Sequence, residues 1–196
     1  MTDQRGRLFV VAGPSGVGKG TVVRRVLERV PRTRLSVSAT TRPPRPSERD
    51  GTDYLFLTEE AFEALALEGG LLEHAKVFGH RYGTPRRWVE ETLRHGLDVV
   101  LEIDVQGARQ VREAVPEAVL VFLAPPSLEE LERRLRSRGT EDEETLARRL
   151  AEAGWELEQR SWFDHVVVNE DVERASAQVA AIIEGFRTLP EGPAHP

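Results

Sequence analysis

GPSGVGKGT, residues 13–21, follows the apolar run Leu8–Ala12 and precedes an apolar, helix-like stretch that begins at Val22. Strand, glycine-rich loop and helix start therefore occur in the order that a phosphate-binding loop requires. The glycines let the backbone turn so that successive N–H groups point at an anion, with the positive end of the following helix behind them. A glycine-rich turn without a ligand is the alternative. Lys19, at the required place after the strand, argues against that alternative.

The lysine of this loop stands out because the chain has 27 Lys and Arg residues, and only Lys19 and Lys76 are lysine. A compact ammonium fits inside a phosphate cradle where a planar guanidinium would be too large. Gly20 stands where the usual pattern has a serine or threonine that binds Mg²⁺, and the hydroxyl comes one place later, at Thr21. We therefore expect Mg²⁺ to be held mainly by water and by nucleotide phosphates.

Length and composition limit the function classes. A chain of 196 residues with a net charge of −6 predicts one domain and argues against general nucleic-acid binding. The absence of cysteine excludes disulfides and thiolate metal sites. The polar start and the short apolar run after it predict neither a signal peptide nor a membrane span, hence a soluble cytoplasmic protein. The composition does not indicate an oligomeric state.

A second anion site is predicted in residues 35–51, where four hydroxyl residues precede three arginines in an extended, proline-rich segment that is followed by a short strand at 54–57. Guanidinium groups bind phosphate through two parallel hydrogen bonds, and hydroxyls complete its coordination. A solvated surface loop is the alternative. Because this segment follows a phosphate loop, a second phosphate site favours an enzyme that binds two nucleotides.

For several polar residues that follow, the surrounding sequence predicts a specific hydrogen-bond or charge partner. Thr58 is expected to cap a helix that runs to Gly69 and Gly70. Glu73 lies in an apolar-flanked strand pattern, where an ionised side chain needs a partner. Thr84 and Pro85 read as the N-cap and first residue of a helix that extends to Gly96, although Thr84 could also contact a ligand.

Strands and helices alternate through the rest of the chain. Asp104 ends the apolar run 97–103, and we expect it beside the phosphate loop, where it could orient Mg²⁺ or accept a hydrogen bond from a substrate base. Two arginine-rich helices, 128–137 and about 140–160, form a candidate lid, although charged helix faces are often merely solvated. Ser127 and Glu130 have the spacing of a capping box that opens the first helix; Gly139 is expected to end it, and Thr140 to open the second. A last strand at 165–169 and a helix at 171–186 complete a doubly wound, mostly parallel α/β sheet.

The spaced motifs resemble those of guanylate kinase, a P-loop nucleoside monophosphate kinase. The matching segments are GPSGVGKGT, SVSATTRPPRPSERDGTDY, EHAKVFGHRYGTP, LEIDVQG and RLRSRGTEDEETLARRL, and the resemblance covers about residues 7–187. It implies transfer of the γ-phosphoryl group of ATP to GMP with Mg²⁺, in purine nucleotide metabolism. It also implies a single domain over 1–190, with core 5–35 and 97–187, a GMP-binding insertion at about 36–96, a lid at about 128–160 and a flexible tail at 190–196.

The resemblance assigns roles residue by residue. The ATP-binding residues it implies are Gly13, Pro14, Ser15, Gly16, Val17, Gly18, Lys19, Gly20, Thr21, Arg134, Arg138 and Asn169. The GMP-binding residues are Ser38, Arg42, Arg45, Tyr54, Glu73, Tyr82, Thr84, Glu102 and Asp104. The catalytic residues are Lys19, Arg42, Arg134, Arg138 and Arg149.

The chemistry of guanine agrees with these assignments. Guanine presents N1–H and its 2-amino group as donors, and ionised Glu73 and Asp104 are acceptors. Two other functions remain open at this point. A kinase of similar build could act on AMP, dTMP or a ribose phosphate, and a guanylate-kinase-like scaffold module could bind phosphorylated peptides in the GMP groove.

Overall fold

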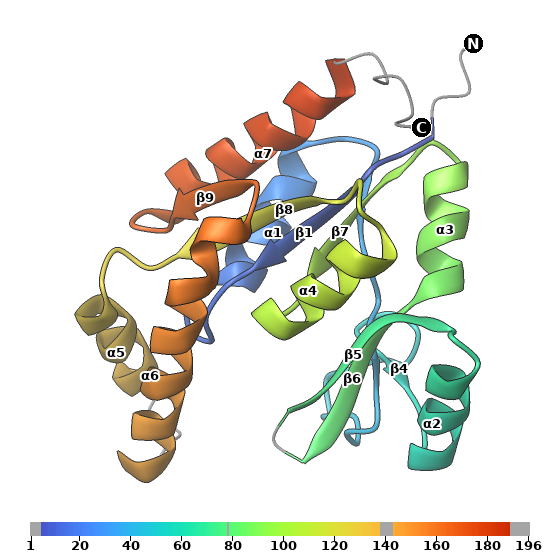
Figure 1. Cartoon of the computed structure of the whole chain (residues 1–196), viewed down its shortest axis with the longest axis horizontal. Coiled ribbons are helices and arrows are strands. Elements are labelled where there is room, and N and C mark those ends of the chain that lie inside the picture. Colours follow the sequence, from blue (N-terminus) through green and yellow to red (C-terminus); the bar gives the residue numbers. More distant parts are fainter. Residues whose placement is uncertain (1–4, 78, 138–142, 189–196) are drawn as a thin grey trace. The chain divides into compact units, whose positions relative to one another are not determined.

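The computed structural model describes residues 5–77, 79–137 and 143–188. They form a mixed α/β fold, which confirms the predicted fold class. Contacts divide the chain into two units. Figure 1 labels the helices and strands. Among the described residues, the first unit contains 5–10 and 32–120, and the second contains 11–31 and 121–188. The predicted insertion at 36–96 lies wholly in the first unit, and the predicted lid at 128–160 lies wholly in the second.

The first unit contains a four-stranded sheet with the order β4-β3-β6-β5. Strands β5 and β6 form an antiparallel hairpin, and β3 pairs with β6 antiparallel and with β4 parallel. Helix α2 covers this sheet, because its buried Phe62 packs with Ala39 of β3 and Leu71 of β5. The elements of the unit are β2 (Thr33–Leu35), β3 (Ala39–Thr40), β4 (Leu55–Phe56), α2 (Glu59–Leu67), β5 (Leu71–Val77), β6 (His80–Pro85), α3 (Arg86–Arg94), β7 (Asp98–Glu102) and α4 (Val105–Ala114).

The second unit carries the glycine loop and the predicted lid. Helices α5 and α6 pack against each other through Leu131, Leu135, Leu146 and Ala153, and Figure 1 shows them as neighbouring helices. Helix α1 packs on α7. The elements are α1 (Lys19–Arg29), α5 (Leu128–Ser137), α6 (Glu143–Glu158), the 3₁₀ helix η1 (Gln159–Trp162), β9 (His165–Val168) and α7 (Val172–Thr188).

The larger sheet has the strand order β2-β7-β1-β8-β9. Strands β1 (Leu8–Ala12) and β8 (Val119–Ala124) are buried along their whole length, as expected for central strands covered on both faces. The pairs β2–β7 and β8–β9 are parallel. The glycine loop follows β1, and Asp104 follows β7.

Local capping explains where several helices begin. The Thr58 hydroxyl accepts a hydrogen bond from Ala61 N–H at 3.2 Å, and Ser127 accepts one from Glu130 N–H at 3.1 Å, so both predicted N-terminal caps are confirmed. The reciprocal half of the predicted capping box is absent, because the Glu130 carboxylate bonds to Arg133 and Arg134 instead.

The prediction that Thr84 caps a helix was wrong. Thr84 and Pro85 belong to β6, and Pro85 is the N-cap residue of α3, with no side-chain hydrogen bond to the helix. The Thr84 hydroxyl donates instead to the Glu73 carboxylate at 2.7 Å. A charge-assisted bond to a buried carboxylate is stronger than a bond to an exposed helix end, which explains the choice.

Some predictions fall outside the described residues: the end of α5 at Gly139, the start of the next helix at Thr140 and the tail from residue 190. Within the described residues, no helix is both long enough and apolar enough to cross a membrane.

Candidate active site

The glycine loop joins β1 to α1 in a conformation that needs glycine. Gly13 has φ 146°, and a Cβ there would lie 2.2 Å from the Leu123 carbonyl oxygen. Gly18 has φ 95° and is the N-cap residue of α1, with no side-chain cap. The first N–H groups of α1 therefore have no capping side chain from the N-cap residue, which is the arrangement that favours an anion at a helix start.

Lys19 is the first residue of α1. Its ammonium donates to the carbonyl oxygens of Gly13 at 2.6 Å and Pro14 at 3.3 Å, so the side chain folds back along the loop. The helix start and the lysine thus bring a positive potential to the same nine-residue segment. Gly20 and Thr21 continue α1 in the first turn, and both are exposed.

Residues from α5 and from the end of β9 hold the loop in place. Asn169 is buried, and its side-chain amide donates to the Val17 carbonyl at 2.7 Å. Arg134 donates to the Asn169 carbonyl at 3.0 Å and to the Glu130 carboxylate at 2.8 Å. A Cβ on Gly16 would lie 2.7 Å from a Leu135 methyl group, so α5 packs directly on the loop. The structure therefore places Arg134 and Asn169 against the loop.

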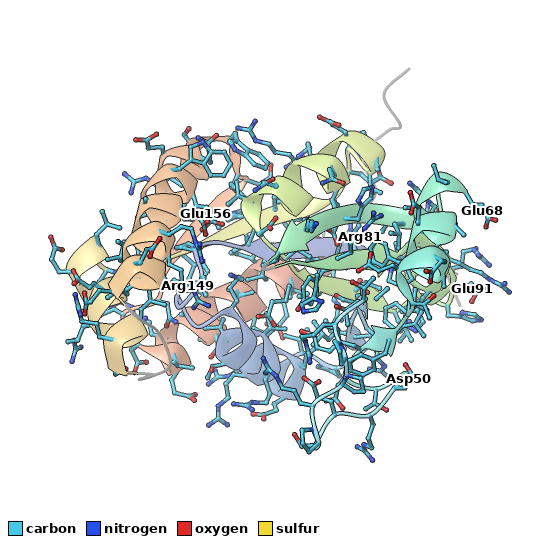
Figure 2. The ribbon with its side chains drawn as sticks, turned by 90° about the horizontal axis from the view of Figure 1, so that it is seen from below. Asp50, Glu68, Arg81, Glu91, Arg149 and Glu156 are labelled. Carbon is cyan, nitrogen blue, oxygen red and sulfur yellow. The ribbon has the colours of Figure 1, made fainter. Side chains whose placement is uncertain are left out.

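The other predicted lid arginines differ in their surroundings. Arg133 is paired with Glu130 on an exposed face, and Arg136 bridges Glu132 and Glu143. These exposed pairs contribute little to stability. Arg149 lies half-buried on α6, where Figure 2 labels it. Arg138 lies outside the described residues.

The first unit contains an arginine enclosed by aromatic rings. Arg42 donates to both carboxylate oxygens of Glu48 at 2.9 Å, and each of the two side chains is 14% exposed. Its guanidinium carbon lies 5.4 Å from the centre of the Tyr54 ring and 5.8 Å from that of Phe56. The Tyr82 ring meets Tyr54 edge-on at 6.1 Å. Arg42 thus has one fixed orientation, set by an ion pair and two rings.

Glu48 is ionised in this cluster. A hydrogen bond from the Arg45 backbone N–H, at 2.8 Å, and the Arg42 guanidinium hold the pKa of the Glu48 carboxyl below its usual range. Burial raises the pKa of the Tyr54 hydroxyl, and the charge of Glu102 acts in the same direction. Ser38 lies at the start of the strand pair β3–β4, where its carbonyl accepts from Leu55 N–H at 2.9 Å. The side chain of Arg45 is exposed.

A buried acid lies on β5 in the same unit. Glu73 is 6% exposed and accepts a hydrogen bond from the buried Thr84 hydroxyl. Burial raises the pKa of the Glu73 carboxyl from 4.5 to about 7; the Thr84 hydroxyl opposes this shift, and the negative charge of Asp104 adds to it. Glu73 and Thr84 are thus joined by a hydrogen bond, and Asp104 is close enough for its charge to act on Glu73.

Asp104 is also the N-cap residue of α4, where its carboxylate accepts from Gly107 N–H at 2.7 Å. Among the described residues, no group of three or more His, Asp or Glu side chains is arranged to hold a metal ion.

Comparison with known proteins assigns the chain to a family. Residues 5–185 match the sequence model of the guanylate kinase family. The chain is 57% identical to a guanylate kinase of Thermus thermophilus over 189 residues, which cover 95% of this chain and 83% of that protein. It is 56% identical to a guanylate kinase of a Synechococcus species over 173 residues, 88% of this chain and 91% of the relative. The chain belongs to the guanylate kinase family.

A solved guanylate kinase from Anaplasma phagocytophilum has the same fold, with a TM-score of 0.77 and 34% identity over 95% of this chain and 88% of that one. The predicted family and enzyme class are thereby confirmed: the chain is a guanylate kinase, a nucleotide-binding transferase. The roles of individual residues remain predictions.

Sequence reasoning missed several residues of the two clusters. It gave no role to Glu48, the ion-pair partner of Arg42, or to Phe56, whose ring lies beside the Arg42 guanidinium. An acid three residues after Arg45 in an arginine-rich segment was the available signal for Glu48. It also gave no role to Gly107, where a Cβ would lie 2.8 Å from a Glu73 carboxylate oxygen. Nothing local in the sequence distinguishes that glycine.

Proposed function

We propose that this chain transfers the γ-phosphoryl group of ATP to GMP, which gives ADP and GDP. In this reaction Glu73 and Asp104 are proposed to recognise guanine by hydrogen bonding. The observation that carries this proposal is the buried Glu73 carboxylate, held by Thr84 and close enough to Asp104 to feel its charge. N1–H and the 2-amino group of guanine are donors that suit two acceptors. AMP would leave a desolvated carboxylate unpaired, at a cost of about 1–3 kcal/mol per group, or about tenfold to a hundredfold in discrimination.

The arginine cluster is proposed to bind the GMP phosphate. Arg42 is held by Glu48 and by two aromatic rings, and a guanidinium in one fixed orientation suits bidentate recognition of a phosphate. Tyr54, directly before β4, and Tyr82, on β6, are proposed to contribute hydroxyls. Glu102 acts on Tyr54 through its charge, and Ser38 and Arg45 precede and follow Arg42 in the chain. The complete proposed set is Ser38, Arg42, Arg45, Tyr54, Glu73, Tyr82, Thr84, Glu102 and Asp104.

The glycine loop is proposed to bind the ATP phosphates as a P-loop. Gly13 to Thr21 provide backbone N–H groups at the start of α1, and Lys19 provides a mobile positive charge. Arg134 is proposed to contact the nucleotide from α5, since it already bonds to the loop. Asn169 lies against the same loop residue, and Arg149 and Arg138 are proposed to approach from the lid.

Catalysis by these residues needs no strong general base, because the attacking phosphate of GMP is already ionised at neutral pH. The residues position the two nucleotides and stabilise the charge that develops on the transferring group. Mg²⁺, when bound through phosphates and water, neutralises part of that charge. We also propose a cytoplasmic location and a role in purine nucleotide metabolism by recycling of GMP.

The experiment that tests this function measures ADP formation from Mg-ATP with GMP, AMP, CMP, UMP and dTMP offered separately. We expect strong preference for GMP. Turnover of a different monophosphate would keep the kinase and refute Glu73 and Asp104 as guanine readers. Absence of turnover with all five, in folded protein, would favour the scaffold-module function.

A further inference from the structure

Strand β5 is an edge strand, and a side chain of helix α4 occupies its free edge. His74 N–H donates to the Gln110 side-chain carbonyl at 3.0 Å, and the Gln110 amide donates to the His74 carbonyl at 2.9 Å. A carboxamide carries one acceptor and donors in one plane, so it pairs with a strand residue much as a neighbouring strand would. The edge that β5 leaves open in the order β4-β3-β6-β5 is therefore closed at His74 by Gln110.

The two hydrogen bonds between Gln110 and His74 lie close to Glu73 and Asp104, the acids proposed to bind guanine, on β5 and on α4 alike. His74 directly follows Glu73 on β5. Gln110 lies one helical turn after Gly107, on the same face of α4. A Cβ on Gly107 would lie 2.8 Å from a Glu73 carboxylate oxygen, and Gly107 N–H donates to Asp104. Helix α4, which packs on β5, therefore bonds to the His74 backbone through Gln110 and lies against the Glu73 and Asp104 carboxylates at Gly107. Figure 1 labels both elements.

The two carboxylates need an external restraint because they repel each other. The charge of Asp104 raises the pKa of Glu73, and the bond from Thr84 anchors Glu73 only to the neighbouring strand β6. Glu73 belongs to β5, whereas Asp104 follows β7, so their spacing depends on how α4 is attached to β5. A fixed spacing matters because one guanine edge presents its two donors at one separation.

We propose that Gln110 is a positioning residue for guanine recognition: its two bonds to His74 fix α4 against β5 and so set the spacing of the Glu73 and Asp104 carboxylates. Gly107 is the matching small residue that lets α4 approach Glu73. This inference rests on the proposed function, because it assumes that the two acids bind guanine.

The test compares Gln110→Ala with wild type in steady-state assays with GMP and with IMP, which lacks the 2-amino group. We expect kcat/KM for GMP to fall about tenfold, mainly through a raised KM, because a displaced carboxylate no longer holds guanine in the productive orientation. The KM for ATP should stay within about twofold, and the preference for GMP over IMP should shrink, since IMP uses fewer of the spaced acceptors. A merely structural role would lower kcat/KM for GMP and for IMP alike.

Three further variants sharpen the test. Gln110→Glu is isosteric, keeps the acceptor for His74 N–H and loses the donor, so it should show the same loss of GMP preference even if Gln110→Ala proves unstable. Gly107→Ala should raise the KM for GMP by displacing the Glu73 carboxylate. Glu113→Ala, an exposed change on the same helix, is the matched control and should behave as wild type.

The outcomes separate this inference from the proposed function. If the wild-type chain does not turn over GMP, the proposed function is refuted, and the inference is refuted with it. Wild-type chain that prefers GMP, together with Gln110 variants indistinguishable from Glu113→Ala, overturns the inference alone. Equal losses with GMP and IMP also overturn it, whereas a selective loss with GMP supports it.

Discussion

Replacing Glu73 with glutamine should stabilise the fold at alkaline pH while weakening GMP binding. Glu73 is 6% exposed, and burial raises the pKa of its carboxyl from 4.5 to about 7. Between these two pH values the folded chain holds a proton that the unfolded chain releases. The free energy of unfolding therefore decreases as pH rises from about 4.5 to about 7, by the contribution of this one group.

The size of the effect follows from the shift. A difference of about 2.5 pKa units corresponds to about 3 kcal/mol, at about 1.4 kcal/mol per unit. Glutamine does not titrate and has nearly the same shape, so Glu73→Gln should lack this decrease. Relative to wild type, the variant should gain about 3 kcal/mol of unfolding free energy between acidic pH and about pH 8.

Denaturant unfolding at about pH 5 and about pH 8 measures this difference, with Glu113→Gln as the control for an exposed acid. At about pH 8 the Glu73→Gln enzyme should also show a raised KM for GMP and a nearly unchanged KM for ATP. Stability relative to wild type that is the same at both pH values would refute the argument that burial holds the proton on Glu73. Equal changes in both KM values would indicate that Glu73 is structural.

Three other substitutions test the loop and one helix cap. Lys19→Ala should lower kcat by at least about a hundredfold, because the loop loses its compact cation; near-normal turnover in a coupled ADP assay would contradict that role. Gly18→Ala should raise the KM for ATP about tenfold and leave that for GMP unchanged, since Gly18 has φ 95° and a Cβ would lie 2.8 Å from the Asn169 amide nitrogen; unchanged ATP kinetics would count against it. Thr58→Ala should lower the free energy of unfolding by about 1 kcal/mol without affecting turnover, and Thr58→Ser should restore it, because the hydroxyl caps α2; denaturant midpoints with an unchanged slope provide the measurement.

Much of the fold could be predicted from the sequence, because these elements depend on the chemistry of neighbouring residues. The order of apolar run, glycine loop and helix predicted β1, the loop and α1, since glycine conformation and helix starts depend on neighbouring residues. The caps at Thr58 and Ser127 were predicted for the same reason. Element boundaries differ by one to three residues; α2, for example, ends at Leu67 and not at the following glycines.

The spaced motifs also predicted the family, because their order and separation carry more information than any one of them. The candidate guanine readers were found by chemical type, since a buried strand position rarely holds an ionisable side chain without a partner.

Only the tertiary structure decided which partner each polar group takes. The Thr84 hydroxyl could cap α3 or bind a carboxylate, and the choice depends on β5 pairing with β6, which brings Glu73 beside it. Arg42 could face solvent, but the turn after it returns Glu48 to its guanidinium. Gln110 and Gly107 look like ordinary helix residues until α4 packs on β5. Periodicity and propensity are properties of neighbouring residues, whereas these contacts join positions brought together only when the sheet forms.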